Sequence, residues 1–154
     1  MMLRFSERVD DGEPVTTLTL PLELRVKGRL RVTLDDGREA GLFLDRGPIL
    51  RDGDKLREAG GEVIEVRAAP EKVSLASCAD EHLFARACYH LGNRHTPLEI
   101  RPLEARYLHD HVLDAMLEGL GLTVTTGEFP FEPEPGAYGE IGTGAEFGGH
   151  SHAH

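Results

Sequence analysis

Apolar and polar residues alternate with a period of two along several short stretches of the first 70 residues. This alternation is typical of half-buried strands, because successive side chains of a strand point to opposite faces. The predicted strands cover residues 17–20, 30–34, 42–44 and 63–66. Turn-forming residues lie between them, at residues 35–37, 51–54 and 60–61. No helical period appears in this part of the chain, so we expect a small all-β domain over residues 1–70.

The pattern changes after residue 70, where apolar residues recur at helical spacing. Two such apolar faces are present: Leu83, Phe84, Ala87, Cys88 and Leu91, and then Val112, Leu113, Met116, Leu117 and Leu120. Each face is followed by a glycine, Gly92 or Gly121, that predicts the end of a helix. Asp80 and Asp110 precede the two faces and are suited to cap the helix N-termini.

Strand-like segments flank both predicted helices, at residues 73–75, 98–100, 105–108 and 122–125. The order β-α-β-β-α-β predicts a ferredoxin-like domain over residues 71–138 and an α+β fold for the whole chain. The other interpretation is that any two amphipathic helices share such spacing. Residues 139–154 are rich in glycine and poor in apolar residues, which predicts a flexible tail.

Composition and charge narrow the class of protein. The 154 residues suffice for one ordinary domain or two small ones, and 40% apolar with 29% charged residues is typical of a globular protein. The chain has no apolar stretch of roughly 18 residues and no apolar segment near its N-terminus, so we expect a cytoplasmic protein without a membrane partner. The net charge is −10, and no basic stripe is present to bind nucleic acid.

Catalytic motifs are not found in the sequence. It holds no phosphate-binding glycine loop, no serine-hydrolase elbow and no zinc-protease motif, so we do not expect an enzyme. The two cysteines, Cys78 and Cys88, do not form a disulfide framework. Cys88 lies on a predicted apolar helix face, as a small buried side chain would. Cys78 precedes that helix and fits either a buried or an exposed place.

Three of the eight histidines, His150, His152 and His154, fall in the last five residues. A flexible tail can bring several imidazoles to one ion, and neutral imidazole suits Ni²⁺, Cu²⁺ and Zn²⁺. The alternatives are a solvated terminus and a remnant of purification, although serine and alanine interrupt the histidines and no linker is visible.

Two further candidates lie in the second half of the chain. His109 and His111 flank Asp110 where a predicted strand meets a helix, and they are either metal ligands or solvated neighbours of a helix cap. His95 lies in a loop outside the apolar pattern, where a histidine is either a ligand or an ordinary hydrogen-bonding residue. His82 and His90 are expected on a helix surface.

Three longer stretches resemble the UreE family of urease accessory proteins, which are nickel chaperones. They are residues 87–95 (Ala-Cys-Tyr-His-Leu-Gly-Asn-Arg-His), residues 103–117 (beginning Leu-Glu-Ala-Arg-Tyr-Leu-His-Asp-His) and residues 130–138 (Pro-Phe-Glu-Pro-Glu-Pro-Gly-Ala-Tyr). The strong similarity spans roughly residues 83–138, with weaker matches such as residues 50–54 in the first domain. A match of this length is far more specific than any short motif.

The resemblance implies a homodimer in which two copies of His95 share one Ni²⁺. It implies that His109 and His111 form a secondary metal site and that the tail histidines are auxiliary ligands. The implied partners are the GTPase of urease maturation and, through it, the urease apoprotein. This tail has three histidines where some relatives have many, and Leu108 stands where some have another histidine, so a storage role is doubtful and the secondary site is expected to be weaker. The alternatives are a peptide-binding co-chaperone with incidental metal binding and a small metalloenzyme with an open site.

Overall fold

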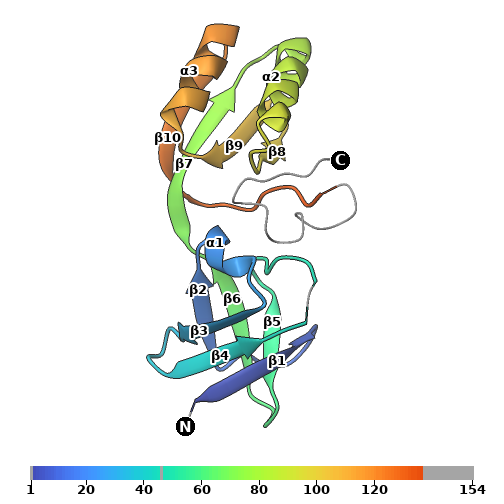
Figure 1. Cartoon of the computed structure of the whole chain (residues 1–154), viewed down its shortest axis with the longest axis vertical. Coiled ribbons are helices and arrows are strands. Elements are labelled where there is room, and N and C mark those ends of the chain that lie inside the picture. The colour runs from blue at the N-terminus through green and yellow to red at the C-terminus, as the bar shows by residue number, and fades with distance from the viewer. Residues whose placement is uncertain (1, 46, 137–154) are drawn as a thin grey trace. The chain divides into compact units, whose positions relative to one another are not determined.

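The protein folds as a mixed α+β chain with two compact units. A computed structural model describes residues 2–45 and 47–136 (Figure 1). The residues up to Ala69 form the first unit, and residues 70–134 form the second. The predicted tail over residues 139–154, with His150, His152 and His154, lies outside the described residues.

The first unit is built on a six-stranded sheet in the order β2-β6-β5-β1-β4-β3. Its elements are β1 (Leu3–Val9), β2 (Thr16–Leu20), α1 (Leu22–Arg25), β3 (Arg29–Thr33), β4 (Glu39–Phe43), β5 (Lys55–Glu58) and β6 (Val63–Ala68). The pairs β1–β4 and β2–β6 are parallel, whereas the other neighbouring strands are antiparallel. Its core gathers the inward side chains of the strands, among them Leu18, Val32, Leu42 and Ile64.

The alternating stretches of the sequence correspond to strands β2, β3, β4 and β6. The predicted turn at residues 35–37 joins the antiparallel pair β3–β4, and Gly37 has the positive φ of 97° that such a turn requires. Strands β1 and β5 were not predicted, because charged residues are as numerous as apolar ones along β1 and outnumber them along β5. The expectation of an all-β domain is wrong in one detail, since α1 adds a single helical turn after Pro21.

A buried arginine ties α1 to the rest of the first unit. The side chain of Arg25 is only 1% exposed. Its Nε donates to the carbonyl oxygen of Leu20, and its Nη1 donates to that of Leu50, both at 3.0 Å. A buried guanidinium is tolerated when its donors are satisfied in this way. Arg25 therefore joins the end of β2 to the loop that precedes β5.

The second unit has the chain order β-α-β-β-α-β. Its elements are β7 (Pro70–Ser77), α2 (Glu81–Asn93), β8 (Glu99–Arg101), β9 (Glu104–Leu108), α3 (His111–Leu120) and β10 (Thr123–Pro130). The strands form a four-stranded sheet in the order β10-β7-β9-β8, and every neighbouring pair is antiparallel. Both helices contribute to one core with the sheet, which includes Ala76, Leu91, Tyr107 and Leu117 (Figure 1).

The predicted helix caps are largely confirmed. An Asp80 carboxylate oxygen accepts from the backbone N–H of Leu83 at 3.1 Å, and Asp110 accepts from that of Val112 at 2.8 Å. Gly121 ends α3 in the left-handed conformation with φ 112°. The expectation that Gly92 ends α2 is wrong, because the helix continues through Asn93.

Most residues of the predicted apolar faces lie in the core or pack against it, whereas Cys88 is half-buried outside this cluster. Leu113 and Leu117 of α3 are buried, as are Ala87 and Leu91 of α2, but the side chain of Val112 in the first turn of α3 is 51% exposed. None of the helices in the described part of the chain combines the length and the apolar character that crossing a bilayer demands.

Candidate metal-binding histidines

His95 lies in the loop that connects α2 to β8. The loop closes the helix with tight backbone hydrogen bonds, since the N–H of His95 donates to the carbonyl of Gly92 at 3.0 Å. His95 is exposed, and its φ is 55°, in the left-handed region that favours glycine. A non-glycine residue held there costs about 1–3 kcal/mol and is often found at functional positions. The left-handed residue after α2 is therefore a histidine, not the expected Gly92.

The positive φ of His95 predicts that glycine at this position gives a more stable protein than alanine does. We expect His95→Gly to unfold at a higher temperature than His95→Ala, with a difference in unfolding free energy of about 1 kcal/mol, because only glycine relieves the positive φ. Both variants lose the imidazole, so the comparison isolates the backbone effect. Thermal unfolding of the two metal-free variants measures it. Equal melting temperatures would show that the loop relaxes away from the left-handed conformation.

His109 and His111 lie on either side of Asp110, at the junction of β9 and α3. The backbone N–H of His109 donates to the carbonyl of Lys72 at 3.0 Å, which extends the pairing of β9 with β7. His111 is the first residue of α3 and is exposed. The structure therefore places one of the two imidazoles beside the sheet and the other at the helix surface.

The imidazole of His109 is held by side chains from β7 and α3. Its Nδ1 lies 3.1 Å from Ser74 Oγ and 3.3 Å from Asp114 Oδ2. The hydroxyl of Tyr107 donates to Asp114 Oδ1 at 2.6 Å. Burial, together with this hydrogen bond to Asp114, raises the pKa of Tyr107 well above its usual range, so the phenol stays protonated as a donor. These contacts hold one side of the ring, while the residue itself is exposed at the surface.

Sequence patterns alone missed three residues of this cluster, namely Ser74, Tyr107 and Asp114. A signal for Tyr107 was present, since Tyr107 alternates with Ala105 on the inward face of β9, and both are buried. A buried tyrosine hydroxyl needs a hydrogen-bond partner. Asp114 is one of two acidic residues on the largely apolar helix α3, and nothing in its spacing indicates that it meets a tyrosine and a histidine.

The described part of a single chain does not assemble a complete metal site from three or more ligands. Over residues 2–45 and 47–136, no three side chains of the types His, Cys, Asp and Glu converge where one ion could bind. The two cysteines are free and half-buried. Burial, with the neighbouring Cys78, raises the pKa of the Cys88 thiol, which disfavours the thiolate that metals and electrophiles need.

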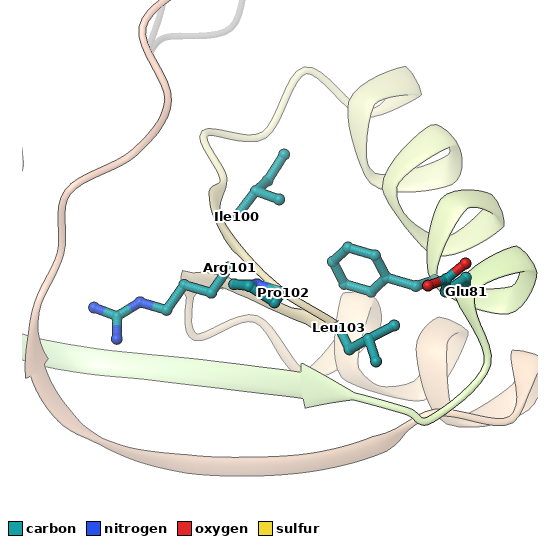
Figure 2. A pocket seen from close by; sticks show the side chains of 6 residues that line it. Glu81, Ile100, Arg101, Pro102 and Leu103 are labelled. Atoms are coloured by element: carbon teal, nitrogen blue, oxygen red, sulfur yellow. The ribbon is translucent and has the colours of Figure 1, made fainter.

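A pocket of about 450 Å³ lies between α2 and the β8–β9 hairpin. Its lining is mainly apolar, and no histidine belongs to it; the lining residues are Glu81, Phe84, Ile100, Arg101, Pro102 and Leu103. Figure 2 shows that Arg101 extends away from Glu81 and Leu103. Its guanidinium is paired with Glu99, whose Oε2 accepts from Nε at 2.8 Å. Glu81 is the one carboxylate among these lining residues, so the pocket does not offer the several ligands that a metal site needs.

Comparison with known proteins identifies the class. The family model described as the N-terminal domain of the UreE urease accessory protein matches residues 5–69. The model of the C-terminal domain of the same protein matches residues 71–154.

Relatives agree over nearly the whole chain, and each is named urease accessory protein UreE. One from Citrobacter koseri is 56% identical over 155 residues, covering 99% of this chain and 99% of its own. One from Pseudomonas putida (strain W619) is 58% identical, covering 89% and 86%, and one from Enterobacter sp. (strain 638) is 59% identical, covering 89% and 91%. These relatives bear the name of an accessory protein rather than of an enzyme. The chain belongs to the UreE family of urease accessory proteins.

Proposed function

We propose that this protein is a metallochaperone that binds Ni²⁺ through histidine side chains and delivers it for assembly of the urease active site in the cytoplasm. The observation that carries the proposal is the presentation of His95. Within a chain of the UreE family, this imidazole is exposed on a loop whose backbone is held in a conformation unfavourable for histidine. An exposed imidazole on a fixed loop is accessible to an ion and to a second protein molecule.

In this proposal the two units have different functions. Residues 1–70 form a partner-binding domain that docks to the urease maturation complex. Residues 71–138 form a ferredoxin-like domain that binds metal and dimerises, and the strand order β10-β7-β9-β8 with both helices in one core supports that fold. The partners are the urease accessory GTPase and, through it, the urease apoprotein.

The primary metal site consists of two copies of His95, one from each subunit of a dimer. A homodimer with a two-fold axis beside the α2–β8 loop presents His95 twice, so that two imidazoles bind one Ni²⁺. Histidines of the tail complete the coordination. A site shared by two chains and completed by tail ligands is open, so the ion leaves by ligand exchange, as delivery requires.

His109 and His111 form a secondary site in this proposal, and His150, His152 and His154 are the auxiliary ligands. Imidazole ligands bind Cu²⁺ more tightly than Ni²⁺ and also accept Zn²⁺. Affinity alone therefore does not select nickel. Selectivity comes from docking to the urease complex and from the metal available in the cell.

Deletion of residues 148–154 is expected to reduce the number of Ni²⁺ ions bound per dimer. The deletion removes three of the eight histidines, whereas His95, His109 and His111 remain. Calorimetric titration of the intact and shortened proteins with Ni²⁺ measures the change, and the melting temperature of the metal-free proteins is the control. An unchanged stoichiometry would show that the tail histidines are not ligands.

A further inference from the structure

We propose that Asp114 is a positioning residue for a metal ligand: with Ser74 and Tyr107 it holds the His109 ring so that Nδ1 is the protonated, inner nitrogen and Nε2 is the nitrogen that binds a divalent transition-metal ion. This inference rests on the proposed function, since it assigns the binding atom and the supporting residues of the secondary site.

The carboxylate of Asp114 determines which ring nitrogen of His109 carries the proton. Asp114 Oδ2 lies 3.3 Å from Nδ1. If Nδ1 were unprotonated, its lone pair would face the negative oxygen, which is repulsive, whereas a proton on Nδ1 is attracted to the carboxylate charge. Asp114 is held in this place from the other side, because the Tyr107 hydroxyl donates to its Oδ1 at 2.6 Å.

Ser74 contacts the same ring nitrogen from β7 and is compatible with the protonated form. Ser74 Oγ lies 3.1 Å from Nδ1 of His109, and a serine hydroxyl oxygen has lone pairs that can accept from an N–H. With a proton on Nδ1, the Ser74 oxygen accepts from Nδ1–H through one of these lone pairs. In this arrangement His109 donates to Ser74, the Asp114 carboxylate lies beside the same N–H, and Tyr107 donates to Asp114. No described buried side-chain polar atom is left without a partner.

With Nδ1 protonated, a neutral His109 keeps its free lone pair on Nε2. No residue in the described part of the chain hydrogen bonds to Nε2, and the His109 side chain is 30% exposed, while Asp114 is 16% exposed. The ring is thus anchored on its inner side by a nearly buried carboxylate and is accessible elsewhere. Metal-binding histidines characteristically donate their second N–H to a carboxylate, which orients the ring and makes the binding nitrogen more basic. Asp114 lies where such a carboxylate is expected, with its Oδ2 3.3 Å from Nδ1.

The first test measures the tautomer of His109 in the metal-free protein. Long-range ¹H–¹⁵N spectra of the full-length dimer distinguish Nδ1–H from Nε2–H, and His109→Ala assigns the signals. We expect the Nδ1–H form in the wild-type protein and a shift towards the Nε2–H form in Asp114→Asn. A purely structural role for Asp114 would leave the tautomer unchanged. An Nε2–H tautomer in the wild-type protein would overturn the proposal, even if Ni²⁺ binding were normal.

The second test measures affinity, using Ni²⁺ titration of the full-length protein carrying His95→Ala, so that the primary site does not mask the secondary one. Asp114→Asn is expected to weaken the binding that His109→Ala removes by about 10- to 100-fold. The control is Glu118→Gln, which removes an exposed charge from the same helix and should change the affinity less than about two-fold.

Equal affinities of Asp114→Asn and Glu118→Gln would overturn the proposal, and so would an unchanged affinity of His109→Ala. With either outcome, the proposed function would still hold if the protein with an intact His95 bound Ni²⁺. If the wild-type protein bound no Ni²⁺, the proposed function would fail, and the assignment of Nε2 as a ligand would fail with it.

Discussion

Replacement of His95 by alanine is expected to abolish the tightest Ni²⁺ site and, with it, urease activation. In the proposed dimer one substitution removes two ligands, because the two-fold axis presents the residue twice. Loss of a residue that only supports a ligand already costs about 10- to 100-fold in affinity, so loss of both ligands should cost at least about 100-fold. The measurements are Ni²⁺ affinity by titration and urease activity in cells.

The variant is expected to remain folded and dimeric, which separates a binding defect from a folding defect. His95 is exposed and lies outside the buried core of the second unit, so its truncation leaves no cavity. The matched control is His82→Ala, which removes an exposed histidine from α2 of the same unit and should leave binding and activation unchanged.

Comparing urease activation by His109→Ala and His111→Ala with that by His95→Ala tests which site delivers the ion. Each is expected to weaken the secondary site and to leave much of the activation intact. If His95→Ala activated urease normally while His109→Ala did not, the cluster at the β9–α3 junction, rather than the α2–β8 loop, would deliver the ion.

The sequence predicted those features of the fold that depend on periodicity and local capping. Leu18 and Leu20 alternate with threonines in β2, and both are buried. Asp80 and Asp110 are helix caps because a short acidic side chain reaches the unpaired N–H groups of the first turn. Such features involve neighbours along the chain, and a pattern therefore reveals them.

Features set by distant contacts were not predictable in this way. Strand β1 pairs with β4 and β5, and those neighbours rather than its own charged sequence keep it extended. Gly92 was a reasonable helix end by composition. The structure instead carries α2 past it and places the left-handed residue at His95, which the apolar spacing of the helix does not indicate.

The candidate histidines were found from residue type and resemblance, but the surroundings of His109 were not. Ser74 and Asp114 lie far from each other in the chain and come together only because β7 pairs with β9 and α3 packs on the same core. A hydroxyl, a carboxylate and an imidazole that lie this far apart in the sequence form no recognisable motif. The ligand was therefore predictable, whereas the residues that orient it required the fold.

Arg25→Ala is expected to destabilise the first unit strongly while leaving Ni²⁺ binding in the second. The substitution leaves the carbonyls of Leu20 and Leu50 without the guanidinium that now satisfies them, and removes a side chain that is only 1% exposed. Loss of buried hydrogen bonds from a charged group should lower the unfolding free energy by about 3–5 kcal/mol. That is a large part of the stability of a small domain, which is about 5–15 kcal/mol.

This variant tests the proposed division of labour between the two units. If the first unit binds partners and the second binds metal, Arg25→Ala should keep its Ni²⁺ affinity within about two-fold, because its metal ligands are untouched, yet lose most urease activation. Denaturant unfolding, Ni²⁺ titration and cellular urease activity measure the three effects. The control is Arg31→Ala, since the Arg31 side chain is 75% exposed in the same unit and its pairing with Glu39 should contribute at most about 1 kcal/mol. Normal activation by a variant with an unfolded first unit would show that this unit is dispensable, and loss of Ni²⁺ binding would show that the metal site depends on it.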